Sequence, residues 1–291
     1  MPPAPPQIRA PKAAAPAASS NGAAAPTTNQ PIAIRKAGDD LPARIMIFAV
    51  EGWGKTTLGA YSPKPIFLMS GGETGIDTLR QHGLVPDVDA FDPCLTWQSV
   101  MDSIDYLIAN DTGHRTLVLD AMGGFERLCH EHVCIRNFNG DWSDKGFFSF
   151  MRGYDQSIPE WITLLQKLDR LRLTRRMAVM VLAHSRIRDF KNPDGGDFSR
   201  YVSDVHEKTW GVTHKWCDAV LFGNFFTVVV EENGRKKGKG GIDRVLYTQH
   251  RDTFDAKNRY GMEPIIDMPD QRELMWETLS KAIKDGQKES A

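Results

Sequence analysis

The residues that could do chemistry begin in a short glycine-rich stretch. Residues 44–61 read RIMIFAVEGWGKTTLGAY, an apolar run that leads into two glycines, a lysine and two threonines. Residues 49–56 fit the pattern G-x-x-x-x-G-K-[ST] except at the first position, where Ala49 replaces glycine. Such a loop surrounds a β-phosphate with backbone N–H groups and the N-terminus of the following helix. Lys55 is then expected to contact the β- and γ-phosphates of ATP, and Thr56 to bind Mg²⁺ through its hydroxyl. The residues assigned to nucleotide binding are Glu51, Gly52, Trp53, Gly54, Lys55, Thr56 and Thr57.

Three further polar residues stand at the end of an apolar run or just after it. Asp120 ends RTLVLD and is expected to bind Mg²⁺ through water, although an aspartate there also suits a helix N-cap. Glu73, in GGETG after PIFLMS, is predicted to orient the attacking water; the alternative is an exposed glutamate in a first helical turn. His184 ends MAVMVLAH and is predicted to sense the γ-phosphate, unless it is an ordinary histidine at a strand end. Together with Lys55, these three residues are the members of the predicted catalytic set that lie in or beside these motifs.

The predicted site residues can meet only if strands and helices place them at the same end of a sheet. From Ala43 on, short apolar runs such as KPIFLMS alternate with longer helical patterns, which is typical of a parallel sheet with helical crossovers. Residues 96–110 and 158–173 each place several apolar side chains on one helical face. The basic segment NGRKKGKGG lies between two strand-like runs, which predicts an antiparallel hairpin with a long exposed tip. A last amphipathic helix is expected over residues 270–285, and the fold class is α/β.

The composition limits the class of protein and its organisation. The 291-residue chain is 41% hydrophobic with a formal net charge of −1, which suits a globular protein and excludes a uniformly basic nucleic-acid coat. Its four scattered cysteines do not suggest a disulfide framework, and no apolar run approaches the ~20 residues of a membrane span, so a cytoplasmic location is expected. Residues 1–38 contain many prolines and alanines and no acid. We therefore predict a disordered arm over residues 1–40 and one ATPase domain over residues 41–291.

The order of these motifs, followed by DAKNRYGMEP at residues 255–264, resembles the RecA-like ATPase core. It is most similar to the phage-encoded RecA-like ATP-binding proteins of single-strand annealing and recombination. The resemblance implies a ring or filament on single-stranded DNA, with ATP and Mg²⁺ held between neighbouring subunits. It also implies that Lys257 and Arg259 complete the predicted catalytic set by reaching the γ-phosphate of the next subunit, the alternative being an ordinary solvated pair. A single-strand binding protein as partner and the host-cell cytoplasm as location follow from the same resemblance.

Two segments mix aromatic with basic side chains, as binding of single-stranded DNA requires. In residues 185–204, which follow His184, aromatic faces can stack on bases while cations neutralise phosphates. In residues 136–156, a place in the core or in a subunit contact is favoured for the four aromatics Trp142, Phe147, Phe148 and Phe150. Residues 129–134, CHEHVC, have a spacing that matches no usual zinc site. The residues assigned to DNA binding are Arg186, Arg188, Lys191 and Arg200.

The favoured function is an ATP-hydrolysing recombination protein that acts on single-stranded DNA by annealing, strand exchange or recombinase loading. Two alternatives stay open. One is a P-loop accessory protein whose nucleotide controls assembly with little hydrolysis. The other is a small-molecule P-loop kinase, which would leave the aromatic and basic segments unexplained. Hydrolysis rates measured with and without single-stranded DNA separate the three functions.

Overall fold

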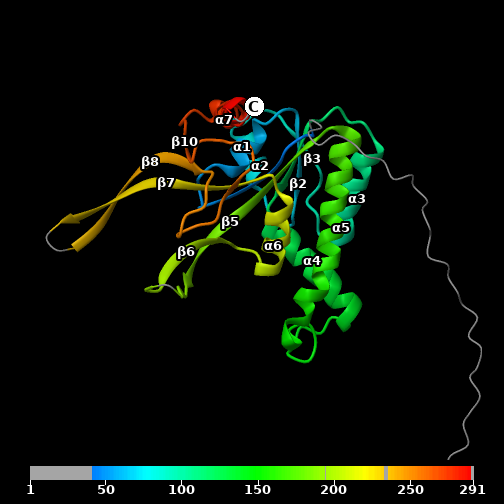
Figure 1. Ribbon diagram of the computed structural model, residues 1–291. Helices are drawn as coiled ribbons and strands as arrows, with labels where there is room; N and C mark the ends of the chain where they lie inside the picture. Colours follow the sequence, from blue (N-terminus) through cyan, green and yellow to red (C-terminus); the bar gives the residue numbers. More distant parts are fainter. Residues whose placement is uncertain (1–40, 194, 233–234, 290–291) are drawn as a thin grey trace, which may run out of the picture. The chain divides into compact units, whose positions relative to one another are not determined.

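The computed structural model describes residues 41–193, 195–232 and 235–289, and only the backbone of residues 228–232, 235–240 and 289 (Figure 1). The predicted arm over residues 1–40 lies outside the described residues, as do residues 233–234 of the basic segment. The domain boundary near residue 40 therefore stays a prediction.

One mixed, ten-stranded sheet forms the centre of the fold (Figure 1). The strand order is β10-β8-β7-β1-β5-β4-β2-β3, with β6 paired to β5 and β9 paired to β7. The strands from β7 across to β3 run parallel, whereas β6, β8, β9 and β10 pair antiparallel with their neighbours. This arrangement confirms the predicted α/β fold with a mostly parallel sheet. The strands are β1 (Arg44–Ala49), β2 (Pro65–Met69), β3 (Asp89–Ala90), β4 (Thr116–Asp120), β5 (Ala178–Phe190), β6 (Phe198–Ser203), β7 (Ala219–Glu232), β8 (Arg235–Tyr247), β9 (Lys257–Asn258) and β10 (Ile265–Met268).

Helices cover both faces of this sheet. Successive side chains of β1 point to opposite faces, so Met46 and Phe48 join a hydrophobic cluster with α3 and α5, while Ile45 and Ile47 join another with α1 and α7. Burial on both faces explains why the strand sequence RIMIFA is almost continuously apolar. The helices are α1 (Lys55–Ala60), α2 (Gly75–Gln81), α3 (Trp97–Ala109), α4 (Met122–Phe138), η1 (Ser149–Met151), α5 (Arg152–Arg175), α6 (Glu207–Trp216), η2 (Arg272–Leu274) and α7 (Met275–Glu289).

Helices α3 and α5 form the predicted amphipathic layer. The Thr96 side chain accepts a hydrogen bond from Ser99 N at 3.1 Å and so caps the N-terminus of α3. The Trp97 and Trp161 rings stack between the two helices at a centroid distance of 5.9 Å. Both predicted apolar faces are buried, which confirms the helical periodicity. Their buried members are Val100, Ile104, Leu107, Trp161, Leu164, Leu165 and Leu168.

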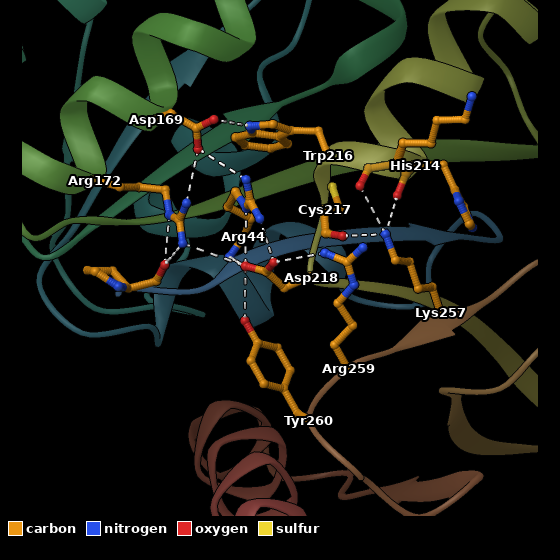
Figure 2. A network of polar contacts seen from close by, with 12 residues as sticks. Arg44, Asp169, Arg172, His214, Trp216, Cys217, Asp218, Lys257, Arg259 and Tyr260 are labelled. Carbon is orange, nitrogen blue, oxygen red and sulfur yellow. Dashed lines mark hydrogen bonds and ion pairs between the residues drawn. The ribbon is translucent and has the colours of Figure 1, made fainter. Parts of the chain in front are cut away.

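An ionic network fixes the amino-terminal ends of β1 and β7 (Figure 2). Arg44 Nη2 donates to Asp218 Oδ1 at 2.6 Å, and Arg44 Nη1 donates to Asp169 Oδ1 at 3.2 Å. Arg172, near the end of α5, donates from Nη1 to the same Asp169 oxygen at 3.0 Å and from Nε to Pro42 O at 2.7 Å. The carboxylates of Asp169 and Asp218 therefore connect β1, α5 and the start of β7. This network lies at the amino-terminal ends of the parallel strands.

Two segments that the sequence does not predict as strands are largely strands. After His184, β5 continues to Phe190, and the chain returns as β6, so that residues 185–203 form a hairpin. The pairing of β7 with β8 likewise extends to Glu232 and Arg235, so most of the basic segment is strand rather than tip. Charged residues and glycine have low strand propensity, so the sequence pattern does not predict these two strand segments. Backbone hydrogen bonds to the neighbouring strand stabilise them.

Candidate functional site

A cavity of about 540 Å³ opens at the carboxyl ends of β1 and β4 and beside His184, where the parallel part of β5 ends. Parallel strands present the side chains at their carboxyl ends to a common crevice, which is the usual ligand site of such sheets. Four residues of the predicted catalytic set line the cavity, namely Lys55, Glu73, Asp120 and His184. Six of the seven residues assigned to nucleotide binding line it as well: Glu51, Gly52, Gly54, Lys55, Thr56 and Thr57.

The glycine-rich turn has the backbone geometry that its sequence suggests. Gly52 has φ +72° and Gly54 has φ +107°, both in the left-handed region that side chains disfavour. Gly54 directly precedes α1, and its carbonyl accepts the hydrogen bond of Leu58 N at 2.9 Å. The two glycines therefore let the chain turn from β1 into the helix while its backbone faces the cavity.

Trp53 is the exception among the residues assigned to nucleotide binding. Its side chain is fully buried in the hydrophobic cluster that β1 forms with α1 and α7. The indole Nε1 donates to Val245 O at 3.1 Å. A Cβ atom at Gly223 would lie 2.6 Å from the Trp53 ring, so the indole packs directly on the backbone of β7. Trp53 thus packs between the glycine-rich turn and β7 and does not line the cavity.

Lys55 and Thr56 begin α1 beside Asp120. Lys55 is 7% exposed and donates from Nζ to Ala49 O at 3.2 Å. Burial lowers the pKa of Lys55, and the charge of Asp120 opposes that shift. Thr56 Oγ1 donates to Asp120 Oδ2 at 2.8 Å, while burial raises the pKa of Asp120 against this hydrogen bond. A hydroxyl and a carboxylate in contact offer the oxygen ligands that Mg²⁺ prefers, so these residues fit the predicted metal.

Glu73 and His184 form an ion pair at the same cavity. Glu73 Oε1 lies 3.7 Å from His184 Nε2, and the two residues come from the segment after β2 and from the middle of β5. The neighbouring imidazole lowers the pKa of Glu73, and the carboxylate in turn raises the pKa of His184. An ionised carboxylate at this position can accept a hydrogen bond from a water molecule in the cavity.

Three charged residues near this cavity are not found by sequence analysis. Arg244 of β8 and Arg272 of η2 line it directly. Asp204 follows β6, donates from its backbone N to His184 O at 3.1 Å, and its charge favours the protonated forms of Lys55 and His184. No local motif surrounds any of the three, because each comes to the site from a different element: Arg244 from β8, Arg272 from η2, and Asp204 from the end of β6.

Lys257 and Arg259 do not line the cavity. Lys257 Nζ donates to the carbonyl oxygens of three residues at the end of α6, at 2.7 to 3.1 Å (Figure 2). An ammonium group has three donors, so these bonds use all of them. Arg259 Nη1 lies 3.6 Å from Asp218 Oδ1, and its side chain is 55% exposed. A role on a neighbouring subunit stays a prediction, and for Lys257 it would require breaking its intrachain bonds.

A second cavity, of about 440 Å³, lies on the β5–β6 hairpin. Arg200 is held there by Phe190, whose ring centroid lies 5.5 Å from the guanidinium carbon, and by Asp255 at 3.6 Å. Arg188 Nη1 lies 3.8 Å from Glu207 Oε2. The hairpin therefore brings cations from both of its strands to one cavity. All four residues assigned to DNA binding line this cavity: Arg186, Arg188, Lys191 and Arg200.

The aromatic segment between α4 and α5 divides into buried and exposed residues. Phe147 is fully buried in a small cluster, which confirms its predicted place in the core. Phe150 is 94% exposed, and both it and Met151 have positive φ values, of 47° and 60°. Met151 also lines a shallow cavity of about 420 Å³ together with Arg186 and Ile187 of the hairpin. Exposed apolar side chains thus lie beside the cationic hairpin.

The mostly parallel sheet, the glycine-rich turn and the lysine that follows it define a P-loop nucleotide-binding protein of the α/β class. Residues 41–260 match the sequence profile of the AAA domain family, and the chain belongs to this family of P-loop ATPases. No curated protein matches the sequence. Among solved structures, the crystal structure of the RadB recombinase is similar, with a TM-score of 0.43, 16% sequence identity, and coverage of 79% of this chain and 90% of that chain. None of the described helices is long and apolar enough to span a membrane.

Proposed function

We propose that this ATPase hydrolyses ATP in response to single-stranded DNA and acts in recombination, by annealing, by strand exchange or by loading a recombinase. One observation supports the coupling most directly. Strand β5 is continuous from the ATP cavity, which His184 lines, to the hairpin cavity, which Arg186 and Arg188 line. Alternate residues of a strand share a face, so these three side chains follow one another along β5. DNA on the hairpin would therefore act on His184 through a single rigid element.

In this proposal ATP occupies the larger cavity with Mg²⁺, which supplies positive charge at the β- and γ-phosphates. Thr56 would bind the metal through its hydroxyl, and Asp120 would bind it through water. Lys55 contacts the β- and γ-phosphates, and Glu73 orients the attacking water. His184 responds to the presence of the γ-phosphate through its ion pair with Glu73, whose Oε1 lies 3.7 Å from His184 Nε2.

The hairpin has the chemistry that a single strand requires. Its exposed cations can neutralise phosphates, and the Phe190 and Phe198 rings pair at its end with a centroid distance of 5.3 Å. Stacking of a base on an aromatic ring contributes ~1 to 3 kcal/mol. Met151 and Ile187 add exposed apolar surface beside Arg186. Since the whole chain is nearly neutral, this local collection of cations and rings favours the hairpin as the DNA surface.

The proposal includes assembly into a ring or filament. Lys257 and Arg259 lie by Asp218, at the amino-terminal end of β7, and therefore away from the ATP cavity of their own chain. They could meet a γ-phosphate only in another copy. Arg259 is the better candidate, because the ammonium of Lys257 already donates to three carbonyls.

Steady-state ATP hydrolysis with and without single-stranded DNA tests the proposed function. We expect DNA to stimulate the parental protein. The variant with Arg186, Arg188 and Lys191 replaced by alanine should lose the stimulation. A control with the exposed Arg80, Arg127 and Lys288 replaced by alanine has the same change in charge and should keep it. If DNA neither binds nor changes the parental rate, the nucleotide-controlled assembly function replaces this one.

A further inference from the structure

Arg244 and Arg272 line the ATP cavity on the side of β8, and neither has a role so far. In the sheet, β7 and β8 lie on one side of β1, and β5 and β4 lie on the other. The groups assigned to the metal and the γ-phosphate, Asp120 and His184, belong to β4 and β5. The γ end of a bound nucleotide therefore lies on the β5 side of Lys55, and its nucleoside must extend toward β8.

A smaller cavity, of about 320 Å³, opens at that side. Arg244 and Arg272 line both cavities, so they form the boundary that the two share. Tyr61 at the end of α1, Leu84 after α2 and Gln271 before η2 complete much of the wall. An aromatic ring, an aliphatic side chain and an amide are the groups that commonly bind the faces and the polar edge of a nucleobase.

Arg244 is held in place from three directions. Its Nε donates to Trp53 O at 2.8 Å, and its Nη1 lies 3.6 Å from Asp270 Oδ1. The guanidinium carbon lies 5.8 Å from the centroid of the Phe225 ring. Because a guanidinium has five N–H donors, these contacts do not exhaust it, and the group can still donate to a ligand oxygen. Arg244 is thus pre-positioned between the P-loop and the smaller cavity.

Arg272 begins η2, directly before α7, and is exposed. A planar guanidinium stacks on aromatic rings better than an ammonium does. We propose that Arg244, Gln271 and Arg272 form the nucleoside half of the ATP site, with the base in the smaller cavity between Tyr61 and Arg272 and the ribose beside Arg244. This assignment rests on the proposed binding of ATP at the P-loop, since the orientation of the nucleotide follows from it.

Calorimetric titration with MgATP and with magnesium tripolyphosphate, which has no nucleoside, tests the proposal. Arg272→Ala should weaken MgATP binding about tenfold, equivalent to ~1.4 kcal/mol, and leave tripolyphosphate binding unchanged. Arg244→Ala should weaken MgATP more than tripolyphosphate. Gln271→Ala should change the ratio of the affinities for ATP and GTP. Arg80→Ala is the matched control, because Arg80 is exposed and pairs only with the surface residue Asp87 among the ion pairs described; it should bind both ligands as the parental protein does.

Two results would overturn the nucleoside assignment while leaving ATP binding intact. In one, Arg272→Ala and Arg244→Ala bind MgATP with parental affinity. In the other, both variants lose tripolyphosphate binding in the same proportion as ATP, which would place the arginines at the phosphates. Since Arg244 also holds the Trp53 carbonyl, retained tripolyphosphate binding reports that the P-loop is still formed in its variant. A parental protein that binds neither ligand would refute ATP binding itself, and the nucleoside assignment with it.

Discussion

Replacing Arg186, Arg188 and Lys191 by alanine should weaken single-stranded DNA binding and reduce its dependence on salt. All three residues are exposed on the β5–β6 hairpin and line one cavity. Arg200 is left unchanged, because its side chain is only 17% exposed and is paired with Asp255. Its removal would disturb the hairpin as well as the charge. The triple variant therefore tests phosphate contacts with little structural cost.

The size of the effect follows from the number of phosphate contacts. Each contact contributes ~0.7 to the slope of log affinity against log salt on single strands, so losing three reduces the slope magnitude by about 2. Arg188 must release Glu207, 3.8 Å away, before it can contact a phosphate, and without its contribution the reduction is ~1.4. For a full reduction of about 2, a rise from about 50 to about 200 mM salt weakens parental binding roughly 16-fold more than it weakens the variant.

Fluorescence anisotropy of a labelled pyrimidine oligonucleotide, titrated at several salt concentrations with and without ATP, measures this slope. The variant with Arg80, Arg127 and Lys288 replaced by alanine carries the same loss of charge away from the hairpin and should keep the parental slope. If the hairpin variant binds with unchanged affinity and slope, the hairpin is not the contact surface, and the basic residues 235–240 of β8 become the next candidate. Weaker binding with an unchanged slope would show that these cations do not meet phosphates.

Three further substitutions test the ATP site. Lys55→Ala should abolish hydrolysis and most ATP binding, because it removes the cation at the phosphates, and parental turnover would refute the P-loop assignment. Glu73→Gln should bind ATP but not turn it over, and an NMR titration should show the pKa of His184 falling toward its ordinary value, since Glu73 raises it. A pKa of His184 that does not change in Glu73→Gln would refute the pairing. The ion pair of Glu73 and His184 stabilises the fold, and this stability is lost as pH rises through the raised pKa of His184 or falls through the lowered pKa of Glu73. Gly223→Ala should destabilise the protein by about 1 to 3 kcal/mol, because the new Cβ would lie 2.6 Å from the Trp53 ring; an unchanged denaturation midpoint would contradict this close packing.

The sequence by itself determines the features that depend on neighbouring residues. The alternation of apolar runs with helical periodicity predicts the parallel sheet, and the apolar faces of α3 and α5 are buried as expected. The spacing of Gly54, Lys55 and Thr56 predicts the turn into α1, because only a few backbone conformations connect a strand to a helix in this way. Asp120 ends β4 as the sequence suggests, whereas His184 ends only the part of β5 that pairs in parallel with β1, because β5 itself continues to Phe190.

Only the tertiary structure decides which distant residues meet. Arg244 reaches the cavity through the position of β8 beside β7, and Arg272 reaches it from η2. Asp204 comes next to His184 through the return of β6 along β5. Trp53 occupies a variable position of its motif, and its burial depends on the space above Gly223 in another strand. Lys257 donates to carbonyls at the end of α6, a partner that no sequence spacing reveals. Local patterns encode backbone geometry and burial, whereas strand order and side-chain partners depend on long-range packing and pairing that a short stretch of sequence does not contain.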